Sequence, residues 1–287
     1  MPSFKHILFP VDFSKQSCGI APYVKCMARR YGARVSMLHA VELPAMGYPD
    51  GPVYGGIDFQ GMLEDGRQRV ESFLKRAFQD VPTTRLMLEG DPARRIAEFA
   101  DKEKVDLIMM PTHGYGRFRR FLLGSVTAKV LHDVNCPVWT NAHSPEIPGP
   151  PRRYSNILCA LDYTPENLPL LRWAALFACE QGAMLKLVHA IPAAKVPGAL
   201  EPEGGRFRTS LFEMAREELA RLQKEAGTNV EILVEGDTVA HVVRRTAEDN
   251  HADLVVIGRG VMHERLGRMR TNVYSVVREA PCPVISV

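Results

Sequence analysis

The stretch around Gly114 and Gly124 has the residue types and spacing of a phosphate-binding loop. Gly114 is followed, after nine residues, by Gly124 and Ser125. An apolar run ending at Met110 comes before this loop, and a helix-like pattern follows it. A strand, a glycine-rich loop and a helix N-terminus together offer free backbone N–H groups and the positive end of a helix dipole to an anion. The pattern therefore predicts a bound phosphate.

Each residue of the loop has a physical role in this hypothesis. Gly114 and Gly124 carry no Cβ, so the backbone can come close to phosphate oxygens. Ser125 and Thr127 can add hydroxyl donors to the free N–H groups at the helix start. Pro111 weakens the prediction, because proline has no N–H and fixes φ. The alternative is that Gly124 and Ser125 only begin a capped helix.

Asp12 could hold the rest of a nucleotide. The first apolar run of the chain closes on Pro10, Val11 and Asp12. In an open parallel sheet, ligands bind beyond the carboxyl ends of the strands, where the strand order reverses. With the order 3-2-1-4-5 this reversal lies between the first and fourth strands, so Asp12 would face the Gly114 loop across one crevice. Asp12 would then accept hydrogen bonds from a base or ribose while the loop holds phosphates.

The sequence contains two copies of the strand and helix pattern that must position these residues. The first copy has an apolar run over 4–13, a helical pattern from Ser14 as N-cap to Gly32 as stop, and a second apolar run over 34–41. The second copy repeats this order 150 residues later, from Asp12 to Asp162. Its parts are the run 154–163, the cap Thr164, the stop Gly182 and the run 184–191. An internal duplication follows.

The repeat continues to the end of both copies. The matching stretches are 88–91 and 234–237, 105–110 and 252–257, and 135–138 and 281–284. The Pro-rich segment 143–153 reads as a linker, which predicts domains over 1–142 and 154–287. Each half has five apolar runs alternating with helical patterns. We therefore expect an α/β fold: two Rossmann-like, doubly wound parallel sheets of five strands, each in the order 3-2-1-4-5.

One region of each half fits this alternation poorly. Residues 44–61 and 192–208 are rich in Gly and Pro and predict loops on one rim of each sheet. The stretches that follow, about 62–78 and 209–226, predict amphipathic helices dense in Glu and Arg. We interpret these charges as solvated helix faces rather than as a binding surface.

The chain resembles a tandem universal stress protein, with the first half of the ATP-binding type. The signature of those members is G-x2-G-x9-G-[ST], and this sequence has Pro111-x2-Gly114-x9-Gly124-Ser125. Every position matches except the first, where Pro111 stands in place of glycine. The Asp at the end of the family's first strand, which contacts adenosine, falls on Asp12. The backbone position that reads the adenine edge falls on Ala40.

The resemblance implies a nucleotide site in the first half and ATP or AMP as its ligand, with or without bound Mg²⁺. The residues that it assigns to this site are Pro10, Val11, Asp12, Ala40, Met110, Thr112, His113, Gly114, Gly124, Ser125, Val126 and Thr127.

The second half departs further from the signature. Its loop is one residue shorter, and Arg270 replaces the last glycine ahead of Thr271. An arginine there either blocks the phosphate site or fills it as a fixed counter-charge. A base pocket can persist, so we expect a second, weaker site. Its residues are Asp162, Ala190, Gly258, Gly260 and Thr271.

Three other groups of residues have a functional and a structural interpretation. Arg117, Arg119 and Arg120 either steer a polyphosphate or form an exposed basic loop. His39 and His189 are interpreted as satisfied histidines at strand ends rather than metal ligands, and no Cys/His spacing matches zinc. Cys136 and Cys282 are interpreted as buried packing residues, with redox sensing as the alternative.

Composition excludes several classes of function. With 46% apolar and 24% charged residues and a net charge of +3, the chain is typical of a globular protein. Neither nucleic acid nor membrane is expected as a partner, and no apolar run has the length of a signal peptide core or membrane span. The six cysteines are scattered and form no CxxC pairs, which predicts reduced, mostly buried thiols and a cytoplasmic location.

The sequence leaves three classes of function open. The first is a regulatory protein of the stress response that binds adenine nucleotide and changes shape or partner. The second is a slow ATPase, although no Walker or kinase motif is present. The third is an interaction protein that needs no nucleotide. By resemblance, the two halves should form an intramolecular pseudo-dimer through their last strands, 138–141 and 284–287, and a further homodimer is conceivable.

Overall fold

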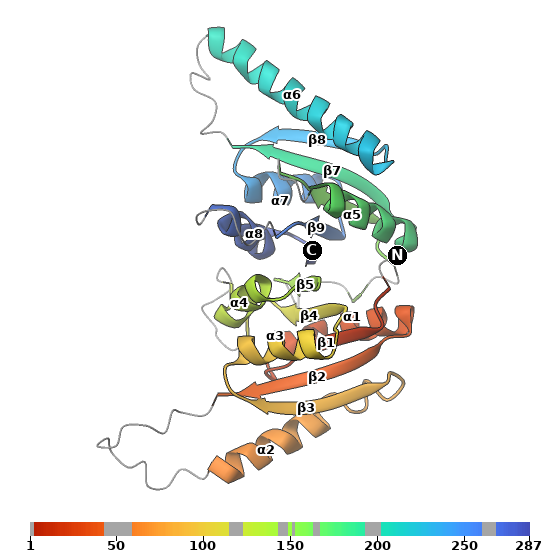
Figure 1. Ribbon diagram of the computed structural model, residues 1–287, viewed down its shortest axis with the longest axis vertical. Coiled ribbons are helices and arrows are strands. Elements are labelled where there is room, and N and C mark those ends of the chain that lie inside the picture. The colour runs from red at the N-terminus through yellow and green to blue at the C-terminus, as the bar shows by residue number, and fades with distance from the viewer. Residues whose placement is uncertain are drawn as a thin grey trace, which may run out of the picture. The chain divides into compact units, whose positions relative to one another are not determined.

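The structure is a computed structural model that describes residues 3–42, 59–114, 123–142, 149–150, 153–162, 167–192, 202–259 and 268–287. Contacts divide the chain into two compact units. One consists of Ser3–Arg117 with Gly124–Pro137, and the other mainly of Val138–Val287. Both alternate strands and helices, as the ribbon in Figure 1 shows.

The first half runs from β1 to β5. Its elements are β1 (His6–Pro10), α1 (Lys15–Tyr31), β2 (Arg34–Val41), α2 (Phe59–Ser72), β3 (Thr83–Glu89), α3 (Pro92–Lys102), β4 (Leu107–Pro111), α4 (Ser125–Asp133) and β5 (Val138–Asn141). In Figure 1, α3 crosses the front of this half's sheet, and α2 packs on β2 and β3.

The second half repeats the same alternation. Its elements are β6 (Asn156–Ala160), α5 (Asn167–Gln181), β7 (Met184–Ile191), α6 (Pro202–Ala226), β8 (Glu231–Gly236), α7 (Val239–Asp249), β9 (Leu254–Ile257), α8 (Arg268–Glu279) and β10 (Val284–Ser286).

The predicted strand order is confirmed. The first half has the order β3-β2-β1-β4-β5, and the second half has its counterpart, β8-β7-β6-β9-β10. Strand β1 pairs in parallel with β2 on one side and with β4 on the other. The reversal of strand order therefore lies between β1 and β4, where the sequence places Asp12 and the glycine loop.

The last strand of each half pairs with the other, as the pseudo-dimer prediction requires. Strand β5 pairs antiparallel with β10, with Trp139 opposite Ile285. Both strands belong to the unit of Val138–Val287. Trp139 is fully buried there, and its indole N–H donates to the Tyr154 hydroxyl at 3.0 Å. This bond satisfies the one polar atom of the indole within the core.

Local signals fix the helix ends as predicted. Ser14 caps α1 by accepting a hydrogen bond from the Ser17 N–H at 3.2 Å. Gly32 ends α1 with φ of 60°, and Gly182 follows α5 with φ of 66°. Glycine is favoured at both because a Cβ disfavours the left-handed conformation. The predicted cap Thr164 lies outside the described residues.

Two predicted helix boundaries are wrong. Helix α2 ends at Ser72 rather than near 78, because Leu74 adopts a positive φ of 51° and the chain continues in turns. Helix α6 begins at Pro202, inside the stretch 192–208 that was expected to be a loop. Proline is tolerated at the first turn of a helix, where its missing N–H is not needed. Most of 44–61 and of the linker 143–153 lie outside the described residues.

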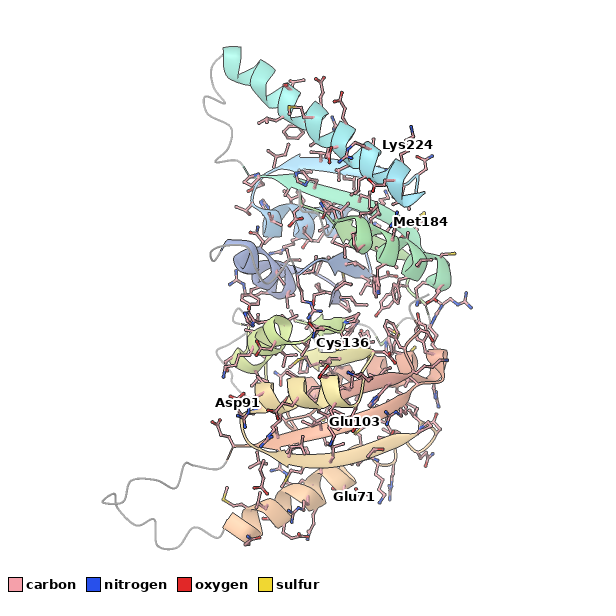
Figure 2. All side chains as sticks on the ribbon, viewed as in Figure 1. Glu71, Asp91, Glu103, Cys136, Met184 and Lys224 are labelled. Carbon is pink, nitrogen blue, oxygen red and sulfur yellow. The ribbon has the colours of Figure 1, made fainter. Side chains whose placement is uncertain are left out.

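The core lies in the sheet and its flanking helices. All residues of β1 and β4 are buried, which explains why their sequences are continuous apolar runs rather than alternating ones. Helix α3 is held at its N-terminus by Asp91, which accepts from the Arg94 N–H at 2.9 Å. Figure 2 labels Asp91 and Glu103 at opposite ends of this helix. Among the described residues, no helix is long and apolar enough to cross a membrane.

Candidate functional site

Asp12 lies just beyond the carboxyl end of β1 and is fixed by the first turn of α1. Its Oδ1 accepts hydrogen bonds from the Ser17 hydroxyl at 2.7 Å and from the Ser14 N–H at 2.9 Å. Within the described part of the chain, its Oδ2 has no hydrogen-bond partner. One carboxylate oxygen therefore orients the side chain, and the other remains available to a ligand.

The Gly114 backbone lies against this second oxygen. A Cβ built on Gly114 would lie 2.0 Å from Asp12 Oδ2, far inside contact distance. Only glycine therefore fits at this position without a shift of the loop or the carboxylate. The two sides of the expected crevice meet, as the strand order requires.

Phe13, the residue after Asp12, packs against two other rings and an arginine. It has a positive φ of 63°, which is unusual for a bulky residue and is found most often where the surroundings hold the backbone in place. Its ring lies 4.4 Å from the His39 ring and 5.2 Å from the Phe73 ring, measured between centroids. The Arg69 guanidinium lies 4.5 Å from the Phe13 centroid, a cation–π contact that ties α2 to this turn.

The second-strand histidines hold the backbone at the end of the first strand in both halves. His39 Nδ1 lies 2.7 Å from the Val11 carbonyl oxygen, and His189 Nδ1 lies 2.9 Å from that of Leu161. Each Nδ1–H donates to the carbonyl, which fixes the tautomer. These are the satisfied histidines that the sequence predicted, and no cluster of metal-ligating side chains occurs among the described residues.

The predicted phosphate side of the first half is the start of α4. The Gly124 N–H donates to the Thr112 carbonyl at 2.8 Å, and the first helical bond runs from the Ala128 N–H to the Gly124 carbonyl. No side chain caps this helix start. The N–H groups of Ser125, Val126 and Thr127 therefore precede the first helical bond and are open to an acceptor.

The Thr127 hydroxyl has a structural role. It is buried and donates to the Pro111 carbonyl at 3.1 Å, so its proton joins α4 to the end of β4. Ser125 is exposed at the helix start. The arginines Arg117, Arg119 and Arg120 lie outside the described residues.

The other residues assigned to the first site line the same strand ends. Pro10, Val11, Met110 and Thr112 are buried there, and Ala40, His113 and Val126 are partly exposed. The Thr112 hydroxyl lies 3.0 Å from His113 Nδ1.

Strand register aligns the two halves residue by residue. Ile7 pairs with Leu107, and the equivalent Ile157 pairs with Leu254. Counting on from these pairs, Gly258 takes the place of Pro111. The Asn135-Cys136 and Pro281-Cys282 pairs align α4 with α8, so that Val273 takes the place of Thr127.

Helix α8 begins earlier than α4. Its first residue is Arg268, and the position equivalent to Ser125 is Thr271, so the helix starts three residues sooner (271 − 268). The N–H groups of Asn272 and Val273 consequently fall within the helix, where the carbonyls of residues 268 and 269 accept them. Gly260 and the side chain of Thr271 lie outside the described residues.

The second half contains a cavity at the same place in the fold. It has a volume of about 90 Å³ and lies at the carboxyl ends of β6, β7 and β9, beside α5, α7 and α8. Asp162 and Ala190, which the sequence assigned to the second site, line it together with Gly258. A Cβ on Gly258 would lie 3.1 Å from Leu170 Cδ2, so glycine keeps this wall open.

The thiols near these sites are poor nucleophiles. Burial raises the pKa of Cys159 and of Cys282 to about 12. Burial and the nearby Asp12 carboxylate raise the pKa of Cys18. Cys282 is buried as predicted and Cys136 is partly so, but Cys18 and Cys179 are exposed. The expectation of mostly buried thiols is therefore wrong, because the helix faces that carry these two residues point to solvent.

Comparison with known proteins agrees with the duplication. The model of the universal stress protein family matches residues 3–140 and again residues 153–287. The chain belongs to the universal stress protein family. It carries two universal stress protein domains in tandem.

Single-domain relatives match about half of the chain. A universal stress protein of Methanocaldococcus jannaschii is 35% identical over 137 residues, which is 47% of this chain and 80% of that protein. One from Thermus aquaticus is 35% identical over 138 residues, covering 47% of this chain and 96% of that protein. A solved universal stress protein from Archaeoglobus fulgidus has the same fold over the full chain, with a TM-score of 0.70, 21% identity and coverage of 100% and 97%.

Sequence reasoning missed two residues that hydrogen-bond to the aspartates of the candidate sites. Ser17 orients Asp12, and Asn167 accepts the Asp162 N–H at 3.2 Å. Both stand five residues after their aspartate. Alignment of the two copies could have revealed this shared polar position inside an otherwise apolar helix face.

Proposed function

We propose that this universal stress protein binds an adenine nucleotide, ATP or AMP, in its first domain, and that occupancy regulates its partners. The observation that carries the proposal is the meeting of Asp12 and Gly114 beside the uncapped start of α4. The Asp12 Oδ2 atom is suited to ribose hydroxyls, and the three open N–H groups of α4 are suited to phosphate. Strand order brings both to the same edge of the sheet.

The first domain is a better phosphate site than the second for a geometric reason. In α4 the N–H groups of Val126 and Thr127 precede the first helical bond. In α8 the equivalent groups of Asn272 and Val273 bond within the helix. The helix dipole alone attracts an anion in both, but only α4 has donors left at the equivalent place.

Regulation is favoured over catalysis by the roles of the described carboxylates. Phosphoryl transfer needs a group that orients the nucleophile and carboxylates that hold Mg²⁺. Asp12 already uses Oδ1 to accept from Ser14 and Ser17, and its remaining oxygen faces the loop. These roles are consistent with nucleotide binding and at most slow hydrolysis of ATP. Mg²⁺ would then accompany the phosphates of ATP rather than occupy a site of its own.

Nucleotide binding to wild type and to one pair of loop variants tests this proposal. Gly124→Arg copies the residue of the second half, and the converse Arg270→Gly is the matched control. We expect ATP and AMP to bind wild type with one dominant site by calorimetry. Gly124→Arg should lower ATP affinity at least tenfold, about 1.4 kcal/mol, and Arg270→Gly should leave that site unchanged.

Two results would contradict the proposal. Equal ATP affinity of wild type and Gly124→Arg would show that the first domain does not bind phosphate at the start of α4. ADP release that is fast, saturable and abolished by Asp12→Ala would make the protein an enzyme. Extraction of the purified protein and chromatography of any released nucleotide gives an independent check.

A further inference from the structure

A separate cavity lies at the amino ends of β4 and β5, the rim of the first half's sheet opposite to Asp12. It is formed where α3 and α4 end and where the chain enters these two strands. Its volume is about 290 Å³. A cavity of roughly 150 Å³ can hold benzene, so this one has room for a small organic molecule. Every lining residue belongs to one compact unit of the chain, and Cys136, labelled in Figure 2, is among them.

The charges around this cavity are mostly negative. Its lining includes the carboxylates of Asp101, Asp106 and Asp133. Lys104 is the one basic residue of the lining, and its Nζ lies 3.4 Å from Asp101 Oδ1. The lining therefore has a formal charge of −2 (1 − 3). Helices α3 and α4 both end here, so the negative ends of two helix dipoles add to this charge. The cavity is suited to a cation.

Two of the carboxylates each have an oxygen available to a ligand. Asp106 uses Oδ2 to accept both the Lys5 N–H at 2.7 Å and the His6 N–H at 2.8 Å. Asp133 uses Oδ1 to accept from His132 Nδ1, and a neutral imidazole can donate this bond without cancelling the carboxylate charge. Within the described residues, Asp106 Oδ1 and Asp133 Oδ2 have no hydrogen-bond partner.

The second half carries a cation of its own at the equivalent helix position. Helices α3 and α7 each have 11 residues, so Ala97 corresponds to Arg244 and Asp101 to Glu248. The Arg244 guanidinium donates from Nε to Glu248 Oε1 at 3.0 Å. In the first half, the small side chain of Ala97 lines the cavity instead. A cationic ligand in the first half would therefore supply the charge that Arg244 supplies within the chain.

Asp253 shows how the second half uses the carboxylate equivalent to Asp106. Its Oδ2 accepts the Ser155 N–H at 2.7 Å, and its Oδ1 accepts the Asn156 N–H at 3.1 Å. Both oxygens of Asp253 are therefore engaged with the backbone. In Asp106 a single oxygen accepts both backbone N–H groups, which leaves the other oxygen to the cavity.

We propose that this first-half cavity binds a short organic diamine, with ammonium or guanidinium groups joined by methylenes. The cationic groups donate to Asp106 Oδ1 and Asp133 Oδ2. The methylenes lie against the aliphatic part of the lining, which includes Ala97, Val105 and Val134. Among the described residues no group of carboxylates is arranged to hold a metal ion, so an organic cation is the ligand class. The site is distinct from the predicted nucleotide site, which lies at the other rim of the sheet.

Methyl NMR of the full chain reads this cavity directly. Val105 and Val134 line it, and Val243 of the second half serves as a remote reporter. The probe is putrescine, with butanediol and succinate as neutral and anionic molecules of the same carbon length. We expect putrescine to shift the Val105 and Val134 signals in a saturable way. Butanediol and succinate should leave both signals in place, and added salt should weaken the putrescine effect.

Variants of two lining residues test the proposed contacts. Ala97→Arg copies the second half and places a tethered guanidinium in the cavity, so putrescine affinity should fall at least tenfold. Arginine is a good helix former, which makes this change compatible with α3. Asp133→Asn removes one carboxylate charge and should weaken binding several-fold. Arg244→Ala is the converse change in the second half and should leave the putrescine shifts of Val105 and Val134 unchanged.

Four results would overturn the proposal. One is the absence of any putrescine shift at Val105 and Val134, and another is an equal shift with butanediol, since the charge would then be irrelevant. Unchanged putrescine affinity in both Ala97→Arg and Asp133→Asn would place the ligand elsewhere. A lysine-rich peptide that shifts these signals where putrescine does not would identify a protein partner in place of a small molecule.

Discussion

Asp12 and Gly114 are in such close contact that no side chain fits between them. A Cβ on Gly114 would lie 2.0 Å from Asp12 Oδ2, although 102 positions (114 − 12) separate the two residues in the chain. The contact joins the end of β1 to the loop after β4. It makes the glycine a requirement of tertiary structure rather than of local turn geometry, because φ at Gly114 is not positive.

Gly114→Ala should therefore destabilise the first half by about 1–3 kcal/mol, the usual cost of overpacking. ATP affinity should fall as well, because the loop and the carboxylate must move apart. Urea unfolding and calorimetry measure the two effects. Gly149→Ala is the control, since a Cβ there meets nothing within 4 Å. In a double-mutant cycle, Asp12→Ala should relieve part of the cost of Gly114→Ala; strict additivity would contradict the contact.

His39→Leu and His189→Leu should each destabilise their half, because each leaves a strand-end carbonyl without its donor. A buried, unsatisfied acceptor costs about 1–3 kcal/mol. We expect the larger loss for His189→Leu, since His189 is 5% exposed and His39 is more accessible. Hydrogen exchange at Val11 to Phe13 should rise only in the His39 variant. Equal stability of both variants and wild type would show that the two bonds contribute nothing.

The stability of the first half should fall as the pH drops below the ordinary pKa of histidine. Burial lowers the pKa of His6 below its usual 6.5, and Arg34 adds to this, while the Glu103 carbonyl and the Asp106 and Glu103 charges oppose it. A lowered folded-state pKa means that the folded state favours neutral His6. Its contribution is present above about pH 6.5 and is lost as the pH falls through the folded pKa.

His6→Asn tests this pH dependence with the residue that the second half has at the equivalent position, Asn156. Thermal unfolding between about pH 7 and pH 5 should show a flatter profile for the variant than for wild type. The variant should also lose some stability at neutral pH, because His6 Nε2 lies 2.8 Å from the Ser36 hydroxyl. Parallel profiles would assign the acid sensitivity to other groups.

Thr127→Val should destabilise the start of α4 by about 1 kcal/mol, because the Pro111 carbonyl loses its donor. The change preserves side-chain shape and copies Val273 of the second half. Looser packing of α4 on β4 should also weaken ATP binding several-fold. The converse Val273→Thr is the matched control and should leave ATP binding in the first half unaffected. A melting temperature equal to wild type would show that the hydroxyl bond has no net effect.

The elements of the fold could be predicted because their signals are local. Strands β2 and β7 have the predicted bounds. The glycine that ends the preceding helix, Gly32 or Gly182, marks where each apolar run begins. The duplication indicated that both halves share one strand order, because two copies of one alternation pattern require the same connections. Helix ends without such signals were misplaced, as the positive φ of Leu74 shows for α2.

The sequence by itself determined the family, the tandem repeat and the residues at the ends of β1 and β4, because caps, glycines and periodicity act over a few residues. Only the tertiary structure decided which atoms meet at these positions. The approach of Leu170 to Gly258 and of Asp12 to Gly114 depends on contacts between elements far apart in the chain. Such contacts are set by the packing of whole helices on a sheet, which no local pattern encodes.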